Sequence, residues 1–421
     1  MKPFQKPRGT RDFLPEEMRT RRKVEKILRD VVELYGFEEV YTPTFELFEL
    51  MSKKAGDDIR NTMYVFRDKG DRELALRAEG TPSVTRVYID EFRTRAKPVK
   101  FYYFYPMFRY DRPQFGRFRE LFQIGIELYG SDSIKSDVEI LSCVIEAYKK
   151  LGFRNFLVKI GDRGPYREVL QNYTENEQNE LLALIDKARE SETIEEYETK
   201  EKYSDVISRI TSLTTLRGAD ALTKIHSIVP EYDPKRVQTI LETLKKLDLD
   251  QYIEIDFSIV RGLEYYTSLV FEVFVPELTI AIGAGGRYDN LVETYGGTKS
   301  PAIGFGFGFD RIMIALEKLN SPLINDTSPI DLYVASVSDN IPLESIVHFF
   351  RSNGIKTEYD LTNRALKKQL SIASAKKIPY VVIVGEDEIK AQKYTLKDMN
   401  TGSEVKLERT QIASKLNSLK K

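Results

Sequence analysis

The chain has 421 residues, of which 41% are hydrophobic and 31% charged. That length and mixture predict two or three folded domains and exclude a mainly disordered protein. The 64 basic and 65 acidic side chains give a net charge of −1, which does not by itself indicate a nucleic-acid partner.

The few cysteines and histidines limit the kinds of cross-link and metal site that the chain can form. Cys143 is the single cysteine, so an internal disulfide is excluded, and with only two histidines beside it a His/Cys zinc site is excluded as well. Cys143 stands at an apolar position of a helical pattern, where we expect a buried core thiol. No run of about 18 apolar residues is long enough to span a membrane and none marks a secretory signal, so we expect a cytoplasmic protein.

Turn signals and periodicity divide the chain into four parts. Residues 1–165 and 251–318 mix helices with aromatic-rich strands, which predicts an antiparallel α+β core. Residues 166–250 show helical spacing and an acidic excess, and we expect a helical insertion. Two prolines among polar residues predict a linker over 319–330. In residues 331–421, strands alternate with helices, which predicts a small α/β domain with a mainly parallel sheet.

The first polar segment is LALRAEGTPS. Read as a strand, it places Arg77, Glu79 and Thr81 on one face. An acid beside a hydroxyl group suits the binding of an ammonium group, whereas the alternative is the end of a surface hairpin.

Residues 101–130 read as two strands around a basic loop. Arg109 closes the first strand, and the loop residues that could reach a phosphate or a nucleic-acid end are Arg112, Gln114, Arg117 and Arg119. Guanidinium groups bind phosphates through paired hydrogen bonds, although the same arginines could serve only to solvate an exposed hairpin.

The second of these strands carries QIGIE. Gln123, Gly125 and Glu127 alternate and therefore face one side of the sheet, whereas Ile124 and Ile126 face the other. A carboxylate and an amide on either side of a glycine predict a polar cup for a small ligand.

Two further segments add an arginine, tyrosines and glycines. In VRGLEYYTS, Arg261 could stabilise charge on a phosphoryl group, and Tyr265 or Tyr266 could bind a polar ring, although tyrosines in strands are often core residues. In AIGAGGRYDNL, close backbone approach is expected at Gly283, Gly285 and Gly286.

PAIGFGFGFDRIMIAL predicts a strand followed by a helix. Gly304, Gly306 and Gly308 share one strand face, which we interpret as a bare surface for a flat base. Asp310 is expected to cap the helix, and Arg311 to project from its first turn, where phosphates are favoured.

Together these segments resemble the class II aminoacyl-tRNA synthetases, and among them the histidyl-tRNA synthetase family. YGFEEVYTPTFE (35–46), with Pro43, is similar to motif 1, residues 101–130 to motif 2 and residues 301–316 to motif 3. RAEGTPS, QIGIE, VRGLEYY and AGGRYD are similar to the histidine-specific segments. Glu264, Asp111 and Asp310 depart from the usual residue by one methylene and keep its charge type.

The resemblance implies a fold and an activity. The fold is α+β, an antiparallel-sheet class II synthetase catalytic core with a helical insertion and a C-terminal α/β anticodon-binding domain. The activity is a ligase reaction of protein biosynthesis, in which ATP activates L-histidine to histidyl-adenylate and the histidyl group passes to the 3′-terminal adenosine of tRNA(His). Mg²⁺ accompanies ATP, no metal ligands in the protein are assigned, and motif 1 builds a homodimer.

The resemblance also implies roles for individual residues. The catalytic residues are Arg109, Arg261 and Arg311. The histidine-binding residues are Glu79, Gly80, Thr81, Arg109, Gln123, Glu127, Arg261, Tyr265 and Tyr266. The ATP-binding residues are Arg109, Glu79, Gly306, Gly308 and Arg311. The residues expected to meet the tRNA acceptor end are Arg112, Gln114, Arg117 and Arg119.

Several alternatives stay open. Arg364, Lys367 and Lys368 could bind the anticodon or form a solvated helix face. Strand parity does not decide which of Tyr265 and Tyr266 contacts the imidazole. The rival functions are a non-catalytic histidine-binding paralogue that regulates ATP phosphoribosyltransferase, and a sensor of uncharged tRNA. The C-terminal domain and the histidine-specific segments argue against the paralogue, and the lack of a kinase segment argues against the sensor.

Overall fold

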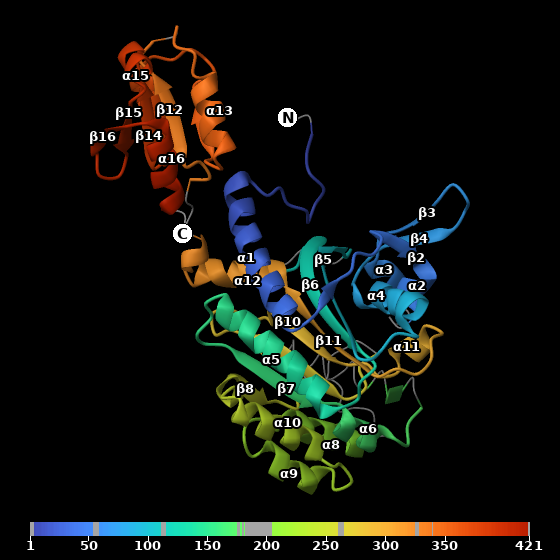
Figure 1. Cartoon of the computed structure of the whole chain (residues 1–421). Coiled ribbons are helices and arrows are strands. Elements are labelled where there is room, and N and C mark those ends of the chain that lie inside the picture. Colours follow the sequence, from blue (N-terminus) through green and yellow to red (C-terminus); the bar gives the residue numbers. More distant parts are fainter. Residues whose placement is uncertain are drawn as a thin grey trace. The chain divides into compact units, whose positions relative to one another are not determined.

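The computed structural model describes residues 4–53, 59–110, 115–174, 177–178, 181, 204–259, 265–324, 328–338 and 340–419. The chain divides into two compact units, Met1–Ile324 and Asn325–Lys421, and each is described by itself (Figure 1). Among the described residues, no helix is long and apolar enough to cross a membrane.

An eight-stranded sheet forms the centre of the first unit (Figure 1). In spatial order its strands are β1 (Glu38–Glu39), β5 (Val99–Phe108), β6 (Glu120–Tyr129), β11 (Ala302–Gly308), β10 (Gly283–Arg287), β9 (Leu269–Phe274), β7 (Leu157–Asp162) and β8 (Ile253–Ile255). All neighbours pair antiparallel except the outermost pairs, β1 with β5 and β7 with β8. The predicted antiparallel α+β core is confirmed.

Helices α1 (Pro15–Leu34) and α5 (Ile134–Lys150) contribute to the main core. Helix α1 begins with a proline, which suits the first helical position, and Ser133 caps α5 by accepting a hydrogen bond from the Lys135 N–H. Ile124 and Ile126 of β6 are fully buried in the same cluster. Cys143 of α5 is also fully buried, as predicted, and burial raises the pKa of its thiol.

A small antiparallel sheet comes before the β5–β6 hairpin in the chain. It consists of β2 (Phe45–Leu47), β4 (Glu73–Leu76) and β3 (Val65–Arg67). The short helices of this unit are α2 (Phe48–Ser52), α3 (Ile59–Thr62), α4 (Thr81–Val87), the π-helix η1 (Tyr88–Phe92), α11 (Leu291–Thr294), α12 (Phe309–Lys318) and η5 (Pro322–Ile324).

The shared strand face predicted for Arg77, Glu79 and Thr81 is wrong. Strand β4 ends at Leu76 and α4 begins at Thr81, so Arg77 and Glu79 lie in the connecting loop and Thr81 is the first residue of the helix. Arg77 is fully buried and donates hydrogen bonds to the backbone carbonyl groups of Thr42 and Pro106. Arg77 therefore stabilises the interior of the fold.

The described part of the expected insertion is helical. Its elements are α6 (Gly164–Leu170), α8 (Ser204–Thr214), α9 (Ala221–Ile228), α10 (Lys235–Lys246) and the 3-10 turn η4 (Asp250–Tyr252). Val237, Ile240 and Leu244 recur at helical spacing on α10 and are buried, so one face of this helix packs into the main core.

The second unit contains a five-stranded sheet. In spatial order its strands are β13 (Thr357–Tyr359), β12 (Leu332–Ser336), β14 (Tyr380–Val384), β15 (Tyr394–Asp398) and β16 (Glu404–Leu407). Its helices are α13 (Glu344–Ser352), α14 (Leu366–Ala375), α15 (Glu386–Ala391) and α16 (Arg409–Ser418). The first three strands are parallel, as the alternation predicts, whereas β15 and β16 add an antiparallel hairpin that the sequence analysis did not include.

Candidate active site

Strands β6 and β11 bring the predicted polar residues to one face of the large sheet. In the register, Gln123 lies opposite Gly308, and Glu127 lies opposite Gly304. Because directly opposed residues share a face, the glycines of β11 lie beside the polar side chains of β6. The predicted alternation of QIGIE is confirmed.

The glycine face of β11 makes room for these side chains. A Cβ atom added at Gly304 would overlap the Glu127 carboxylate and the Tyr288 hydroxyl, and one added at Gly306 would overlap the Gln123 amide. Side chains of the protein therefore fill the space above these two glycines. Gly308 is less confined: the atoms nearest to a Cβ atom added there would be the Ile282 carbonyl oxygen at 3.0 Å and Arg311 Cδ at 3.6 Å.

Glu127 is the buried acid at the centre of this face. Its side chain is 2% exposed, Thr81 Oγ1 donates a hydrogen bond of 2.7 Å to Oε1, and the Tyr288 hydroxyl donates to Oε2. Burial raises the pKa of Glu127 to about 8, and the nearby charge of Glu79 contributes to the rise. The carboxyl group therefore holds a proton at neutral pH unless a cationic or donating ligand stabilises its charged form.

A second acid lies beside the first. The Tyr265 hydroxyl donates a 3.0 Å hydrogen bond to Glu79 Oε2, and burial together with Glu79 raises the pKa of Tyr265. The rings of Tyr265 and Tyr266 are 5.0 Å apart, and a Cβ atom at Gly286 would meet Tyr266. Both tyrosines lie outside any strand, before β9 begins at Leu269, so the strand parity assumed for them is wrong.

The sequence analysis missed Tyr103, which occupies the space beside Gly125. It lies opposite Gly125 in the β5–β6 register, and its ring also abuts Gly80. Its hydroxyl lowers the pKa of Glu127, against the larger effect of burial, and its ring stacks on that of Tyr105 with the centroids 4.7 Å apart. Pairing the two predicted strands residue by residue would have revealed this contact.

Tyr288 was also missed. It directly follows β10 in the AGGRYD segment, and its buried hydroxyl reaches Glu127. The sequence analysis assigned this segment close backbone approach at its glycines and a resemblance to a histidine-specific segment, but no role to Tyr288.

Two of the predicted catalytic arginines lie near this face, where they bind backbone groups. Arg109 Nε donates to the Ala78 carbonyl at 2.9 Å, directly before Glu79. Arg311 Nη1 donates to the Ala281 carbonyl at 2.7 Å and Nε to that of Gly116 at 3.3 Å. Arg261 lies outside the described residues.

The predicted acceptor-end residues are only partly described. Arg112 and Gln114 lie outside the described residues, whereas Arg117 is exposed. Arg119 is half-buried, and its guanidinium lies 4.1 Å from the centroid of the Tyr110 ring. The hairpin itself is confirmed, with Val99 paired to Tyr129 and Phe108 to Glu120.

Asp310 does not cap α12, so that expectation is wrong. The N-cap residue is Gly308, and the buried Asp310 carboxylate instead binds Arg11 Nη2 at 2.6 Å, Arg21 Nη1 at 2.9 Å and the Phe122 N–H at 2.7 Å. The carboxylate therefore ties the N-terminal segment and α1 to β6 and α12.

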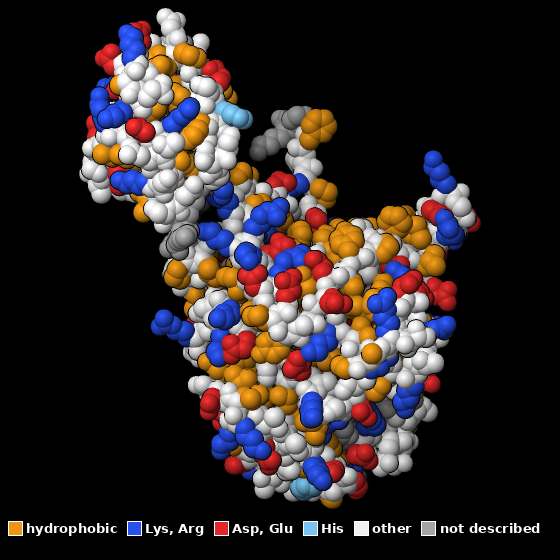
Figure 2. Space-filling view, viewed as in Figure 1, with side chains coloured by type: hydrophobic (Ala, Val, Ile, Leu, Met, Phe, Trp, Pro, Cys, Tyr) orange, Lys and Arg blue, Asp and Glu red, His pale blue; other side chains and the backbone are white. Residues whose placement is uncertain are grey.

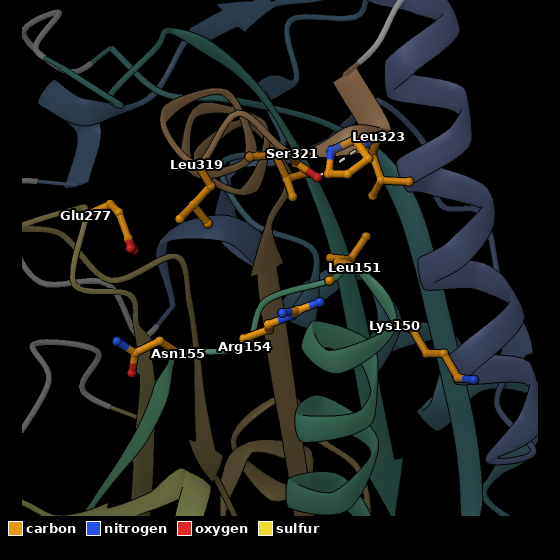
Figure 3. Close-up of a pocket in the computed structure, with 11 residues that line it drawn as sticks. Lys150, Leu151, Arg154, Asn155, Glu277, Leu319, Ser321 and Leu323 are labelled. Atoms are coloured by element: carbon orange, nitrogen blue, oxygen red, sulfur yellow. Dashed lines mark hydrogen bonds between the residues drawn. The ribbon is translucent and has the colours of Figure 1, made fainter.

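A separate pocket of about 450 Å³ lies at the C-terminal end of α5 (Figure 3). The residues labelled in Figure 3 are Lys150, Leu151, Arg154, Asn155, Glu277, Leu319, Ser321 and Leu323. None of the predicted site residues lines this pocket. Within the described ranges, no group of three or more His, Cys, Asp or Glu side chains could hold a metal ion.

The antiparallel sheet, the basic hairpin β5–β6 and the glycine strand that leads into α12 define a class II aminoacyl-tRNA synthetase core. The sequence matches the family described as "Histidyl-tRNA synthetase" over residues 9–312 and the "Anticodon binding domain" over residues 331–419. The chain belongs to the histidyl-tRNA synthetase family.

Relatives that match over nearly the whole of both chains carry the same family name. The histidine–tRNA ligase of Methanococcus vannielii is 41% identical over 415 residues, which cover 96% of this chain and 97% of the relative. The histidyl-tRNA synthetase structure from Nostoc sp. PCC 7120 matches with a TM-score of 0.80 and 25% identity over 99% of both chains. The apo S. aureus histidyl-tRNA synthetase matches with a TM-score of 0.74 and 27% identity, covering 98% of this chain and 99% of that chain.

Proposed function

We propose that this protein is a histidine–tRNA ligase, which activates L-histidine with ATP and transfers the histidyl group to the 3′-terminal adenosine of tRNA(His). The observation that carries the proposal is the buried Glu127 with its hydroxyl partners Thr81 and Tyr288, in a chain of this family. A neutral imidazole has one donor and one acceptor, and a carboxylate beside phenol groups can satisfy both.

The polar side chains around Glu127 fit the rest of the amino acid. Glu79, Thr81 and Gln123 supply a carboxylate, a hydroxyl and an amide that can accept hydrogen bonds from the α-ammonium group. Glu127 with Tyr265 or Tyr266 binds the imidazole. A site built from such hydrogen bonds rejects analogues that lack them by on the order of 10⁴-fold.

The chemistry needs positioning and charge stabilisation. The histidine carboxylate oxygen attacks the α-phosphorus of ATP, the bond from that phosphorus to the oxygen shared with the β-phosphate breaks, and pyrophosphate leaves. Mg²⁺ bound with ATP would neutralise part of the phosphate charge. We assign Arg109 to the α-phosphate and the substrate carboxylate, Arg261 to the charge that develops there, and Arg311 to the terminal phosphates. In the second step, a hydroxyl of the terminal adenosine attacks the adenylate carbonyl and AMP leaves.

Gly308 would let ATP approach the backbone, whereas Tyr103 packs against Gly80 and Gln123 packs against Gly306. Gly80 lies at the N-terminus of α4, and Gly306 and Gly308 lie on the strand that leads into Arg311. We assign Gly306 and Gly308, with Glu79, to ATP.

The tRNA would contact both units. In the first unit, the hairpin loop with Arg112, Gln114, Arg117 and Arg119 would meet the acceptor end. In the second unit, Lys367 and Lys368 are exposed on α14, and Arg364 is exposed and held by Asp360 at 2.8 Å. Fixed and exposed cations of this kind can bind the phosphates of an anticodon stem.

The proposal includes a homodimer in the cytoplasm. Tyr41 is 70% exposed and Phe45 is 51% exposed beside the exposed Phe66, whose ring lies 6.1 Å from that of Phe45. The face seen in Figure 2 has hydrophobic side chains in the region of β2 to β4. An exposed apolar cluster within and beside the motif 1 segment supports a subunit interface there.

Aminoacylation of tRNA transcripts tests the function. The purified protein should attach labelled histidine to a tRNA(His) transcript in the presence of ATP and Mg²⁺, and not to a tRNA of another identity. Histidine binding without any charging would favour the regulatory paralogue.

A further inference from the structure

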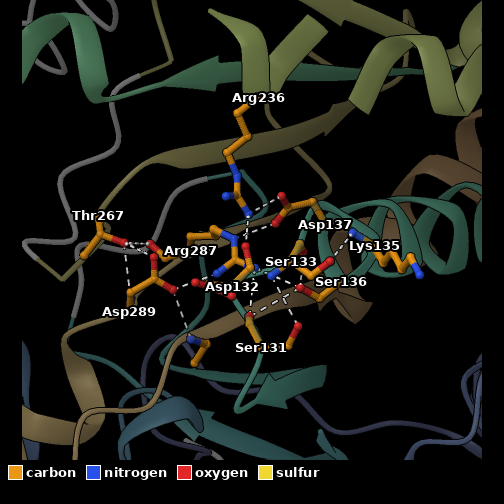
Figure 4. A network of polar contacts seen from close by, with 11 residues as sticks. Ser131, Asp132, Ser133, Lys135, Ser136, Asp137, Arg236, Thr267, Arg287 and Asp289 are labelled. Atoms are coloured by element: carbon orange, nitrogen blue, oxygen red, sulfur yellow. Dashed lines mark hydrogen bonds and ion pairs between the residues drawn. The ribbon is translucent and has the colours of Figure 1, made fainter. Parts of the chain in front are cut away.

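A buried ion-pair network joins the helical insertion to the back of the histidine pocket (Figure 4). Arg287, the last residue of β10, is 1% exposed, and Asp137, in the first turn of α5, is fully buried. Arg287 Nε donates to Asp137 Oδ1 at 2.5 Å, and Nη1 donates to Asp289 Oδ1 at 2.7 Å. Its Nη2 group donates to the Ser136 hydroxyl at 2.9 Å and to a backbone carbonyl.

Strand alternation connects this network to the pocket. Gly286 lies opposite Gly304, on the face of Glu127, so Arg287 points to the opposite face, toward α5. Tyr288 follows Arg287 and extends its hydroxyl to Glu127. Two successive residues therefore hold α5 behind the sheet and the carboxylate of the pocket in front of it.

The same network fixes the segment after the tyrosine pair. The Thr267 N–H donates to the Arg287 carbonyl at 2.7 Å, and its hydroxyl contacts Asp289 at 3.3 Å. Asp289 also accepts a 3.1 Å hydrogen bond from the Ala302 N–H at the start of β11. Displacement of Arg287 would therefore disturb Tyr288 and Thr267 together.

Arg236 extends the network into the insertion. From the second residue of α10, its Nη2 group donates to Asp137 Oδ2 at 2.5 Å and to the Asp132 carbonyl at 2.9 Å. Figure 4 shows the side chains of Arg236 and Arg287 converging on the Asp137 carboxylate. Asp137 is thus shared between one arginine of the sheet and one of the insertion, and charge-assisted hydrogen bonds of this kind are strong and directional.

We propose that Arg236 is a positioning residue for histidine binding: through Asp137 and Arg287 it holds Tyr288 on Glu127, so that the placement of the insertion sets the affinity of the pocket for histidine. The inference rests on the proposed function, since it requires histidine to bind at Glu127. Arg236 itself touches no substrate.

The test is histidine binding to the full-length Arg236→Gln variant, measured by calorimetry without ATP or tRNA. We expect the dissociation constant to rise about tenfold, a typical strength of coupling between two sites. In pyrophosphate exchange, KM for histidine should rise in parallel, with kcat changed by less than about threefold. The matched control is Arg209→Gln, because Arg209 donates to the Ile228 carbonyl within the insertion helices. This control should bind histidine as the wild type does.

A double-mutant cycle separates positioning from a loss of general stability. With Tyr288→Phe as the second change, the double variant should bind histidine about as weakly as Tyr288→Phe alone, because no hydroxyl is left to misplace. Arg236→Lys keeps the charge opposite Asp137 and should recover most of the affinity. The inference would be overturned if the two substitutions multiplied each other's effect on the dissociation constant for histidine, or if Arg236→Gln bound histidine normally. A wild-type protein that binds no histidine would instead overturn the proposed function.

Discussion

Glu127 is an acid that the fold shields from water and surrounds with hydroxyl groups. Since its partners are neutral, its charge has no fixed cation to compensate it among the described contacts. A histidine side chain that donates a hydrogen bond would supply the missing stabilisation. The acid should therefore determine amino-acid affinity more than the phosphoryl chemistry.

Glu127→Gln should raise the dissociation constant for histidine by about 100-fold, because a charged acceptor is replaced by a neutral amide. Calorimetry with histidine measures the effect, and ATP binding should stay unchanged. Glu317→Gln, at an exposed position of α12, provides the control. Equal histidine affinity in both variants would contradict the assignment of Glu127.

The same acid makes stability depend on pH. Burial raises the pKa of Glu127 from 4.5 to about 8, so the folded protein retains a proton that the unfolded chain releases above about pH 4.5. This contribution to the free energy of unfolding is fully present below pH 4.5 and is lost as the pH rises through 8. Urea unfolding of ligand-free protein between pH 5 and 8.5 should show the wild type losing stability relative to Glu127→Gln. Parallel curves would refute the raised pKa.

Sequence alternation was sufficient to group Gln123, Gly125 and Glu127, because it depends only on local strand geometry. Tyr103 and Tyr288 could not be found in the same way. Their contacts with Glu127 depend on the strand register and on the end of β10, which are set by pairing between distant segments.

At the scale of elements, the N-terminal segment stabilises strand β6 and helix α12 of the site. The Arg11 guanidinium lies 3.4 Å from the Phe118 ring centroid, and that of Arg21 lies 4.0 Å from the Phe13 ring centroid. Both arginines converge on Asp310. The sequence indicated a helix cap at Asp310 because acids commonly cap helices, and it contained no local signal for a pairing across about 300 residues of chain.

Asp310→Asn should lower the free energy of unfolding by about 3–5 kcal/mol, because it leaves two arginines without their carboxylate in a buried site. Urea denaturation followed by circular dichroism measures the loss. Asp12→Asn is the control, since Asp12 is exposed and lies 3.4 Å from Lys6, and its loss should cost less than about 1 kcal/mol. A similar small loss for Asp310→Asn would show that the pairing contributes little.

At the scale of the whole molecule, composition shifts and turn signals were enough to anticipate two kinds of sheet, because each kind follows from the order of strands and helices. The added hairpin β15–β16 was missed, since YTLKD and EVKL are only five and four residues long. The predicted segment boundaries stay predictions, while the structure divides the chain into two compact units after Ile324.

Lys367→Glu with Lys368→Glu should raise KM for tRNA by about tenfold or more and leave histidine-dependent pyrophosphate exchange unchanged, because two phosphate-binding charges are reversed far from the adenylate chemistry in sequence. Aminoacylation at several salt concentrations measures the effect, and its salt dependence should weaken. Lys390→Glu serves as the control, as Lys390 is exposed on α15. An unchanged KM would assign α14 to a solvated face.

Histidine activation is the central claim, and pyrophosphate exchange into ATP tests it most directly. The purified protein with Mg²⁺ and without tRNA is incubated with each of the twenty amino acids in turn. The account predicts exchange with histidine alone. Absence of exchange with histidine, or equal exchange with another amino acid, would contradict it.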